Sequence, residues 1–143
     1  MTEADISLIT TASSLHDIGK IRIPEEILNK PGRLTDEEFR IMKTHSELGA
    51  DMIQDMHFPK DNSLVCASWE ICRWHHERWD GKGYPDGLKG EEIPISAQVV
   101  SIVDVYDALT SERCYKKAFD HDTAIQMILD GQCGQFNPIS LSA

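Results

Sequence analysis

Apolar residues recur every three or four positions along most of the chain, which is the spacing of amphipathic helices. Capping residues stand at two of the helix starts: Thr2 or Asp5 opens the first helix, and Thr35 with Glu38 forms a capping box. We therefore predict an all-α fold. The expected helices cover residues 2–15, 35–55, 62–78, 96–109 and 122–129, with a short helical turn over 24–28.

The segment 96–109 is predicted to be a central, buried helix, because valine and isoleucine cover most of its circumference. Asp104 and Asp107 lie in the middle of it. A buried carboxylate is unfavourable unless it is paired or binds a metal. We expect metal ligation for Asp104, and pairing with Arg113 or Lys116 for Asp107.

Three histidines continue the apolar faces of other predicted helices. His45 lies three positions after Met42, and His75 and His76 each follow an inner-face residue by four positions. A single histidine on an apolar face is more often a hydrogen-bonded core residue than a ligand. Two adjacent imidazoles at a helix end, followed directly by a glycine-rich loop, favour a metal site more strongly than a single histidine does.

A His16-Asp17 pair ends the first helix, and a carboxylate there can bridge two ions because it has two oxygens. Lys20 follows within one turn; it is either functional or simply a favourable charge at a helix C-terminus. Together these positions describe a helical bundle whose core holds two divalent ions. Nitrogen and oxygen ligands without thiolates suit iron or manganese, with nickel or zinc as alternatives. Paired metals of this kind hydrolyse phosphate esters.

Residues 79–95 form an exposed but ordered loop rich in glycine. Its glycines allow the backbone to approach a ligand closely, and Tyr84 can stack on a base. The alternative is a long connection held together by turns.

The composition fits one domain over residues 1–143, and the tail 131–143 has no clear pattern. A net charge of −10 argues against a nucleic acid polymer or an anionic membrane as partner. We find no signal peptide and no membrane-spanning run. The cysteines, which lack paired spacing, are expected to be free thiols in a reducing cytoplasm: Cys66, Cys72, Cys114 and Cys133.

The sequence resembles the HD-GYP family, a subgroup of the HD phosphohydrolase superfamily, over about residues 5 to 130. The segments that carry the resemblance are Leu15-His16-Asp17-Ile18-Gly19-Lys20, Leu28-Asn29-Lys30-Pro31-Gly32, His45, His75-His76-Glu77-Arg78-Trp79-Asp80-Gly81-Lys82-Gly83-Tyr84-Pro85, and Asp104-Val105-Tyr106-Asp107-Ala108.

This resemblance implies an HD-domain-like helical bundle with a metal site in its core. It also implies hydrolysis of cyclic di-GMP, a bacterial second messenger, to the linear dinucleotide or GMP. The implied metal ligands are His16, Asp17, His45, His75, His76 and Asp104, with Asp17 as the bridge. Lys20 is implied to touch the attacked phosphate or the water. The implied substrate-binding residues are Gly83, Tyr84, Pro85, Asp107, Arg113 and Lys116.

The chain departs from the family pattern in three places. Helices that usually precede the His-Asp pair and supply a further ligand are absent, so a homodimer could replace them. Cys114 stands in Arg113-Cys114-Tyr115 where the family has proline, and Asn137 stands where it has aspartate.

Two other readings stay open. One is a catalytically incomplete module that senses a cyclic dinucleotide or binds a diguanylate cyclase or another signalling protein. The other is a hydrolase of a different nucleotide with the same metal core.

Overall fold

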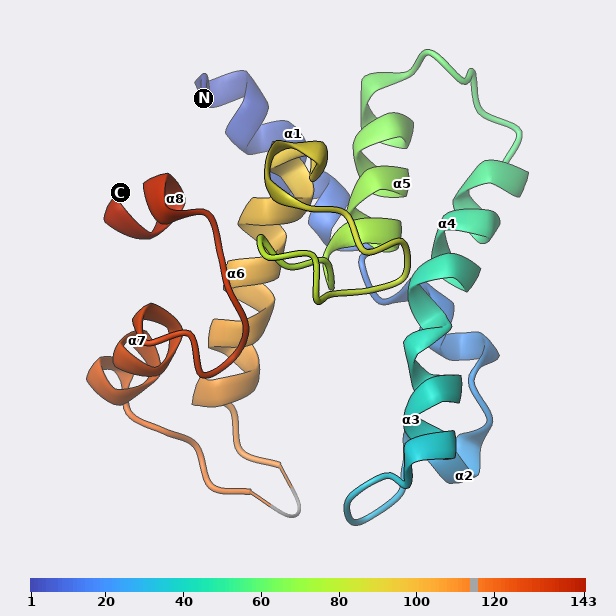
Figure 1. Cartoon of the computed structure of the whole chain (residues 1–143). Helices are drawn as coiled ribbons and strands as arrows, with labels where there is room; N and C mark the ends of the chain where they lie inside the picture. Colours follow the sequence, from blue (N-terminus) through green and yellow to red (C-terminus); the bar gives the residue numbers. More distant parts are fainter. Residues whose placement is uncertain (114–115) are drawn as a thin grey trace.

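Helix α5 (Ser63–Trp74) lies at the centre of a helical bundle, with other helices on three sides (Figure 1). The computed structural model describes residues 1–113 and 116–143, and these form helices without any strand, which confirms the predicted all-α class. The remaining elements are α1 (Glu3–Ser13), the 3-10 helix η1 (Ile18–Arg22), α2 (Glu25–Leu28), α3 (Asp36–Lys43), α4 (His45–Asp55), the 3-10 helix η2 (Gly90–Glu92), α6 (Ile95–Thr110), α7 (His121–Leu129) and α8 (Pro138–Ser142).

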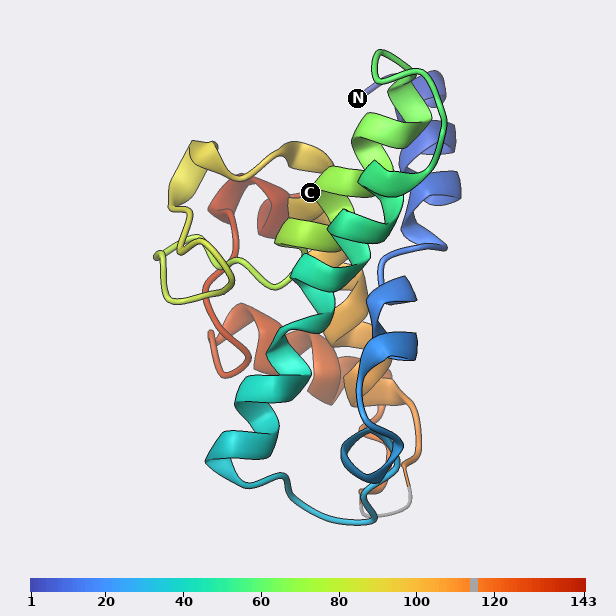
Figure 2. The same cartoon turned by 90° about the vertical axis from the view of Figure 1, so that its right-hand side faces the viewer.

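The core forms around α5, which packs against α1, α4 and α6, as the two perpendicular views show (Figures 1 and 2). On one side, Ile71 of α5 is buried with Ile9 of α1 and Val100 of α6. On the other side, Cys72 is buried with Ile53 of α4. Burial on several sides fixes the C-terminal end of α5, where the two adjacent histidines stand.

The predicted helix starts are confirmed where capping residues marked them. Thr2 and Asp5 form a reciprocal capping box at α1, with bonds of 2.7 and 3.2 Å. Thr35 and Glu38 do the same at α3, with bonds of 2.8 and 3.2 Å. Each box satisfies amide groups that have no partner inside the helix.

The predicted five-turn helix over 35–55 is wrong as a single element, because it breaks at Thr44 into α3 and α4. The Thr44 amide and hydroxyl both donate to the Ile41 carbonyl, at 3.1 and 2.6 Å, which tightens the last turn of α3. Helix α3 contains no buried residue, and Phe39 is 47% exposed. Helix α3 therefore lies outside the core, and the break leaves His45 as the first residue of α4.

The prediction that 96–109 is a central, buried helix is confirmed for only part of its surface. Val103 of α6 is 59% exposed, because α5 and α7 cover only part of the helix. Asp107 is exposed as well, and its hydrogen-bonding neighbour is the Ser111 hydroxyl at 3.4 Å. The expected ion pair of Asp107 is not among the contacts of the described residues; Lys116 instead donates to the Ala108 carbonyl at 3.1 Å.

The tail, for which the sequence has no pattern, forms α8 and packs onto the bundle. The Trp79 amide donates to the Gln135 carbonyl at 2.9 Å, and Phe136 is buried beside α6 and α7. The Arg78 guanidinium donates to the Cys133 carbonyl at 3.3 Å and to the Ser101 hydroxyl at 2.9 Å. The tail is thus held in place by residues such as Arg78, which lies 55 positions earlier in the chain than its partner Cys133. In the described part of the chain, the helices fall short of the length and apolarity that crossing a membrane requires.

Candidate metal centre

Turns and helix ends bring six predicted ligands together in the middle of the bundle. His16 and Asp17 lie between α1 and η1, while His45 opens α4. His75 caps the end of α5, with His76 directly after it. Asp104 projects from the middle of α6. Four separate parts of the fold thus meet at one cluster.

Two glycines allow η1 to approach α4 closely. A Cβ atom on Gly19 would collide with the His45 carbonyl and with the Gly49 backbone nitrogen. Likewise, a Cβ atom added to Gly49 would lie only 3.2 Å from the Gly19 nitrogen. Because no side chain separates the two backbones, Asp17 comes within reach of His45.

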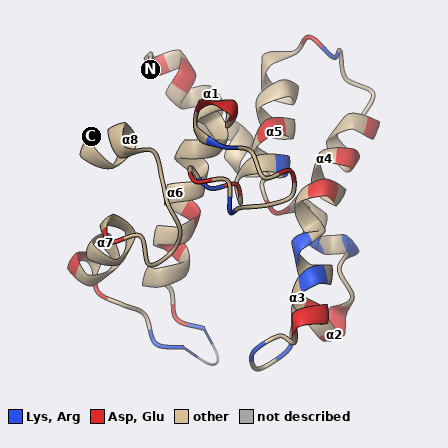
Figure 3. Ribbon diagram, viewed as in Figure 1, with Lys and Arg blue, Asp and Glu red and all other residues tan. Residues whose placement is uncertain are grey.

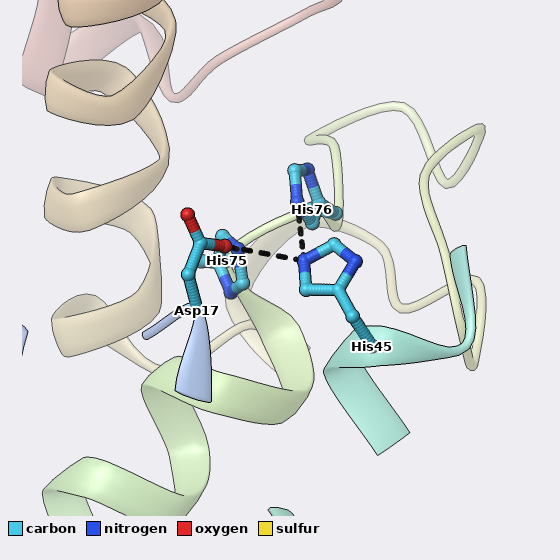
Figure 4. A group of neighbouring side chains, drawn as sticks. All are labelled: Asp17, His45, His75 and His76. Carbon is cyan, nitrogen blue, oxygen red and sulfur yellow. Dashed lines mark hydrogen bonds and ion pairs between the residues drawn. The ribbon is translucent and has the colours of Figure 1, made fainter. Parts of the chain in front are cut away.

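The first group of ligand atoms surrounds one oxygen of Asp17 (Figure 4). Asp17 Oδ1 lies 3.3 Å from His45 Nε2 and 3.7 Å from His75 Nε2. His76 completes the group, because its Nε2 lies 3.2 Å from that of His45. Figure 4 shows these side chains pointing toward one another from three elements of the fold.

The second group lies against the other oxygen of Asp17. His16 Nε2 is 3.2 Å from Asp17 Oδ2 and 3.3 Å from Asp104 Oδ1. His75 is close enough to belong to this group as well as to the first. The two oxygens of Asp17 thus face different sets of ligands.

Backbone hydrogen bonds fix which nitrogen of each ring faces the cluster. The Nδ1 atoms of His16, His45 and His75 each lie 2.7 Å from a carbonyl three or four residues earlier in the chain. A carbonyl can only accept, so Nδ1 carries the proton. In the neutral ring the Nε2 lone pair then points into the cluster, as metal ligation requires.

The residues fit a divalent metal. His75 is fully buried, and its Nε2 has no hydrogen-bond partner in the described structure. Ligands that share one ion at about 2.0–2.2 Å lie about 2.8–3.6 Å apart at tetrahedral or octahedral angles. The five separations given above run from 3.2 to 3.7 Å, which is close to that range, and all ligand atoms within each group lie within 4.8 Å of one another.

Electrostatics within the cluster keep the carboxylates charged. Burial alone would raise the pKa of Asp17, but its interactions with the imidazoles of His16, His45 and His75 outweigh burial and lower that pKa well below its usual range. Hydrogen bonds first to Asp104 and then to Asp17 raise the pKa of His16 to about 10. Without metal, the proton on His16 therefore balances part of the negative charge, and a bound cation would replace it.

His76 has the opposite environment. Burial first, and then the neighbouring His75 and His45, lower the pKa of His76 well below its usual value. The imidazole is neutral at physiological pH and can offer its lone pair without first losing a proton.

The other predicted site residues lie at different distances from this centre. Lys20 is adjacent, with its Nζ 3.0 Å from Asp17 Oδ2. The ring of Tyr84 stacks on His76, with centroids 4.8 Å apart and planes inclined by 17°. The backbone at Gly83 lies so close to residues 76–78 that a Cβ there would collide with it. Pro85 follows through a cis peptide bond.

The remaining predicted substrate residues do not touch the cluster in the described structure. Asp107 lines a cavity of ≈360 Å³ between α1 and α6 that also reaches His16 and Asp104. Arg113 is exposed, and its backbone pairs with that of Lys116 after the end of α6. Cys114 and Tyr115, which belong to one departure from the family pattern, lie outside the described residues.

Sequence reasoning did not single out Glu77, which anchors the glycine-rich loop. Glu77 is 2% exposed, and its Oε1 accepts from the amides of Asp86 and Gly87 at 2.7 and 3.0 Å. Asp86 accepts two further bonds from the Arg73 guanidinium, at 2.8 and 2.9 Å, and one from the Trp74 indole. One signal in the sequence could have identified Glu77. It is a carboxylate that directly follows two inner-face histidines and precedes a glycine-rich loop, whose backbone amides need acceptors.

Comparison with known proteins agrees with this fold and site. A family model described as HD domain matches residues 1–138, so the chain belongs to the HD domain family. It is 46% identical over 145 residues to a cyclic di-GMP phosphodiesterase of Vibrio cholerae, covering 100% of this chain and 29% of that protein. It is 38% identical over 138 residues to 3'3'-cGAMP-specific phosphodiesterase 2 of the same organism, covering 96% of this chain and 26% of that protein. Within the HD family, the chain is an HD-GYP member.

A solved structure shows the same fold. Bd1817, a HDG"Y"P protein from Bdellovibrio bacteriovorus, superimposes with a TM-score of 0.70 at 22% identity, over 99% of this chain and 43% of that one. The chain spans well under half the length of each protein with which it is compared.

Proposed function

We propose that this domain is a metal-dependent phosphodiesterase that hydrolyses cyclic di-GMP to the linear dinucleotide or GMP. The observation that carries the proposal is the convergence of six ligand side chains, with three Nε2 atoms oriented by backbone bonds and the buried Nε2 of His75 lacking any other partner. The name of the relative that is 46% identical supports the choice of substrate.

Two divalent ions, iron or manganese in this proposal, would be held by the two groups. His45, His75, His76 and Asp17 Oδ1 would hold one, while His16, Asp104 and Asp17 Oδ2 would hold the other. Asp17 would therefore bridge them. When bound, such ions lower the pKa of a water molecule and stabilise negative charge on a phosphodiester.

The chain supplies the groups that orient the substrate. Lys20, beside Asp17, can donate to a phosphate oxygen at the cluster or to the attacking water. Arg113 and Lys116 follow α6, the helix that carries Asp104, and are proposed to hold phosphate. Figure 3 shows Lys and Arg in the segment after α6 and also around η1 and the end of α3, although acidic residues predominate elsewhere. Local positive charge of this kind can offset the repulsion of a dianion by a protein with net charge −10.

The same cluster makes the catalytically incomplete module the weaker proposal, because a sensor has no need for six converging metal ligands. Cyclic GMP–AMP is a second candidate substrate, since a relative that carries that specificity in its name is 38% identical. Protein partners, such as a diguanylate cyclase or a second copy of the chain, stay predictions from the sequence.

Reconstitution of the metal-free protein with manganese, or with iron without oxygen, tests the proposal when cyclic di-GMP turnover and metal content are both measured. Asp17→Asn should lose metal and reduce turnover at least about 10³-fold, because one side chain serves both groups. The control is Asp51→Asn on the exposed face of α4, which should behave as wild type. Wild-type protein that retains two metals but cleaves neither cyclic di-GMP nor cyclic GMP–AMP would refute the proposed activity.

A further inference from the structure

Lys43, the last residue of α3, holds its ammonium group against two aromatic rings beside the cluster. Its Nζ lies 4.9 Å from the ring centre of Phe39 and 5.4 Å from that of Tyr84. Tyr84 stacks in turn on His76, with ring centres 4.8 Å apart. Lys43 is therefore separated from a proposed metal ligand by a single aromatic ring.

Three of the other lysines in this part of the molecule have hydrogen-bond acceptors. Lys20 donates to Asp17, Lys30 donates to Glu38, and Lys116 donates to a backbone carbonyl. Within residues 1–113 and 116–143, the Lys43 ammonium group has neither an ion pair nor a hydrogen bond and contacts only the two rings, although the residue is half-buried. A lysine ammonium has three donors and no acceptor, so Lys43 can offer all three to a ligand.

Phe39 stands one helical turn before Lys43 and is 47% exposed. Helix α3 contributes no buried residue to the core, so packing of the core does not account for an aromatic side chain there. An exposed aromatic ring beside a free cation is a combination that nucleic-acid-binding proteins use to stack bases. The break at Thr44 places this pair next to His45 and within reach of the loop that carries Tyr84.

We propose that Phe39 and Lys43 form a guanine-binding subsite, in which the base stacks on Phe39 and Lys43 donates to its O6 and N7 atoms. Guanine presents two adjacent acceptors on that edge, whereas adenine presents an amino donor next to N7. Lys43 would therefore discriminate guanine from adenine. This inference rests on the proposed function, because it assumes a cyclic dinucleotide with one phosphodiester at the cluster.

The experiment compares Lys43→Met, which keeps the stem over the rings but removes the donors, with Lys43→Arg, which keeps charge and donors. Affinity is measured by calorimetry, and kcat and KM by turnover, for cyclic di-GMP and cyclic di-AMP. We expect Lys43→Met to lower both the affinity and kcat/KM for cyclic di-GMP about tenfold, with the change in kcat/KM arising from a higher KM. The affinity and kcat/KM for cyclic di-AMP should stay unchanged. Lys43→Arg should retain the preference, and metal content should stay constant in both variants.

Two further variants separate base recognition from general effects. Phe39→Leu should weaken both dinucleotides to a similar extent, because stacking does not distinguish the bases. Lys60→Met removes an exposed lysine from the distant loop between α4 and α5 and should change neither constant.

The outcomes for the subsite and for the activity are distinct. If wild type cleaves cyclic di-GMP and Lys43→Met keeps its full preference for guanine, the subsite is refuted while the proposed function stands. If wild type cleaves neither dinucleotide, the proposed function fails. The subsite is then tested by binding alone: the ratio of the affinities for cyclic di-GMP and cyclic di-AMP should be about tenfold lower in Lys43→Met than in wild type, and an equal ratio refutes the subsite. Wild type that binds neither dinucleotide overturns both.

Discussion

At the scale of single residues, the chemistry of this site depends on how each side chain is oriented by its own stretch of backbone. His16, His45 and His75 are all held by carbonyls of the preceding turn, so the local fold selects the ring nitrogen that faces the cluster. Such orientation costs no rearrangement when metal binds.

The thiol of Cys72 should be far less reactive than that of Cys66. Cys72 is fully buried, its Sγ donates to the Leu15 carbonyl at 3.0 Å, and burial raises its pKa to about 12. Cys66 is exposed. Because the thiolate is the nucleophile, iodoacetamide at pH 8 should alkylate Cys66 in the native protein and Cys72 only after unfolding. Peptide mass spectrometry measures both; rapid native labelling of Cys72 would contradict the packing of α4 on α5.

At the scale of elements, close backbone contact brings ligands together, and loop anchoring places the substrate loop beside them. The contact of Gly19 with α4 brings Asp17 to His45, and Glu77 holds the loop that carries Tyr84. The first contact sets the position of a ligand, and the second sets the position of the ring that stacks on His76.

Gly19→Ala should destabilise the fold by about 1–3 kcal/mol, because its Cβ must push η1 away from α4. The same displacement should separate Asp17 from His45 and reduce metal content. Gly32→Ala is the matched control, since a Cβ at Gly32 meets nothing within 4 Å. Urea denaturation and metal analysis provide the two measurements. Equal stability and equal metal content of the two variants would show that η1 can move freely.

Glu77→Ala should cost about 1–3 kcal/mol of stability, because it leaves the amides of Asp86 and Gly87 without an acceptor. As a positioning residue, Glu77 should affect KM more than kcat, since the loosened loop carries Tyr84. Glu77→Gln keeps a carbonyl oxygen and should restore most of both properties, while Glu91→Ala, on the exposed 3-10 helix η2, should change neither. A KM in Glu77→Ala equal to that of wild type would contradict the anchoring role.

At the scale of the whole molecule, a site built from four parts of the chain links metal binding to global stability. Residues of the cluster are contributed by positions as far apart as 16 and 104. The unfolded chain cannot bring these together, so metal should bind the folded state selectively.

Manganese at about 100 times its dissociation constant should therefore stabilise the metal-free protein by about 2.7 kcal/mol, which corresponds to a rise in Tm of roughly 5–10 °C. Differential scanning calorimetry with and without chelator measures the effect. Asp17→Asn is the control, because it should show little or no shift. An unchanged Tm in metal-loaded wild type would mean that the ions do not join the elements of the bundle.

The sequence by itself determined the periodic and local features of this protein. Apolar spacing predicted the helices, and the capping boxes at Thr2 and Thr35 predicted where two of them begin. The same periodicity placed His45 and His75 on inner faces, where both are buried. These features follow from interactions within a turn or two of chain, which a sequence pattern records directly.

Tertiary structure decided which faces meet and how closely. The packing of Gly19 on α4, the burial of Glu77 beneath its loop and the docking of the tail on Arg78 all join residues that no local pattern relates. The break at Thr44 is a partial exception, because its bonds are local, yet the apolar spacing runs through it without interruption. Periodicity states which side of a helix is apolar; only the packed bundle determines what lies against that side, and therefore where the carboxylates and imidazoles converge.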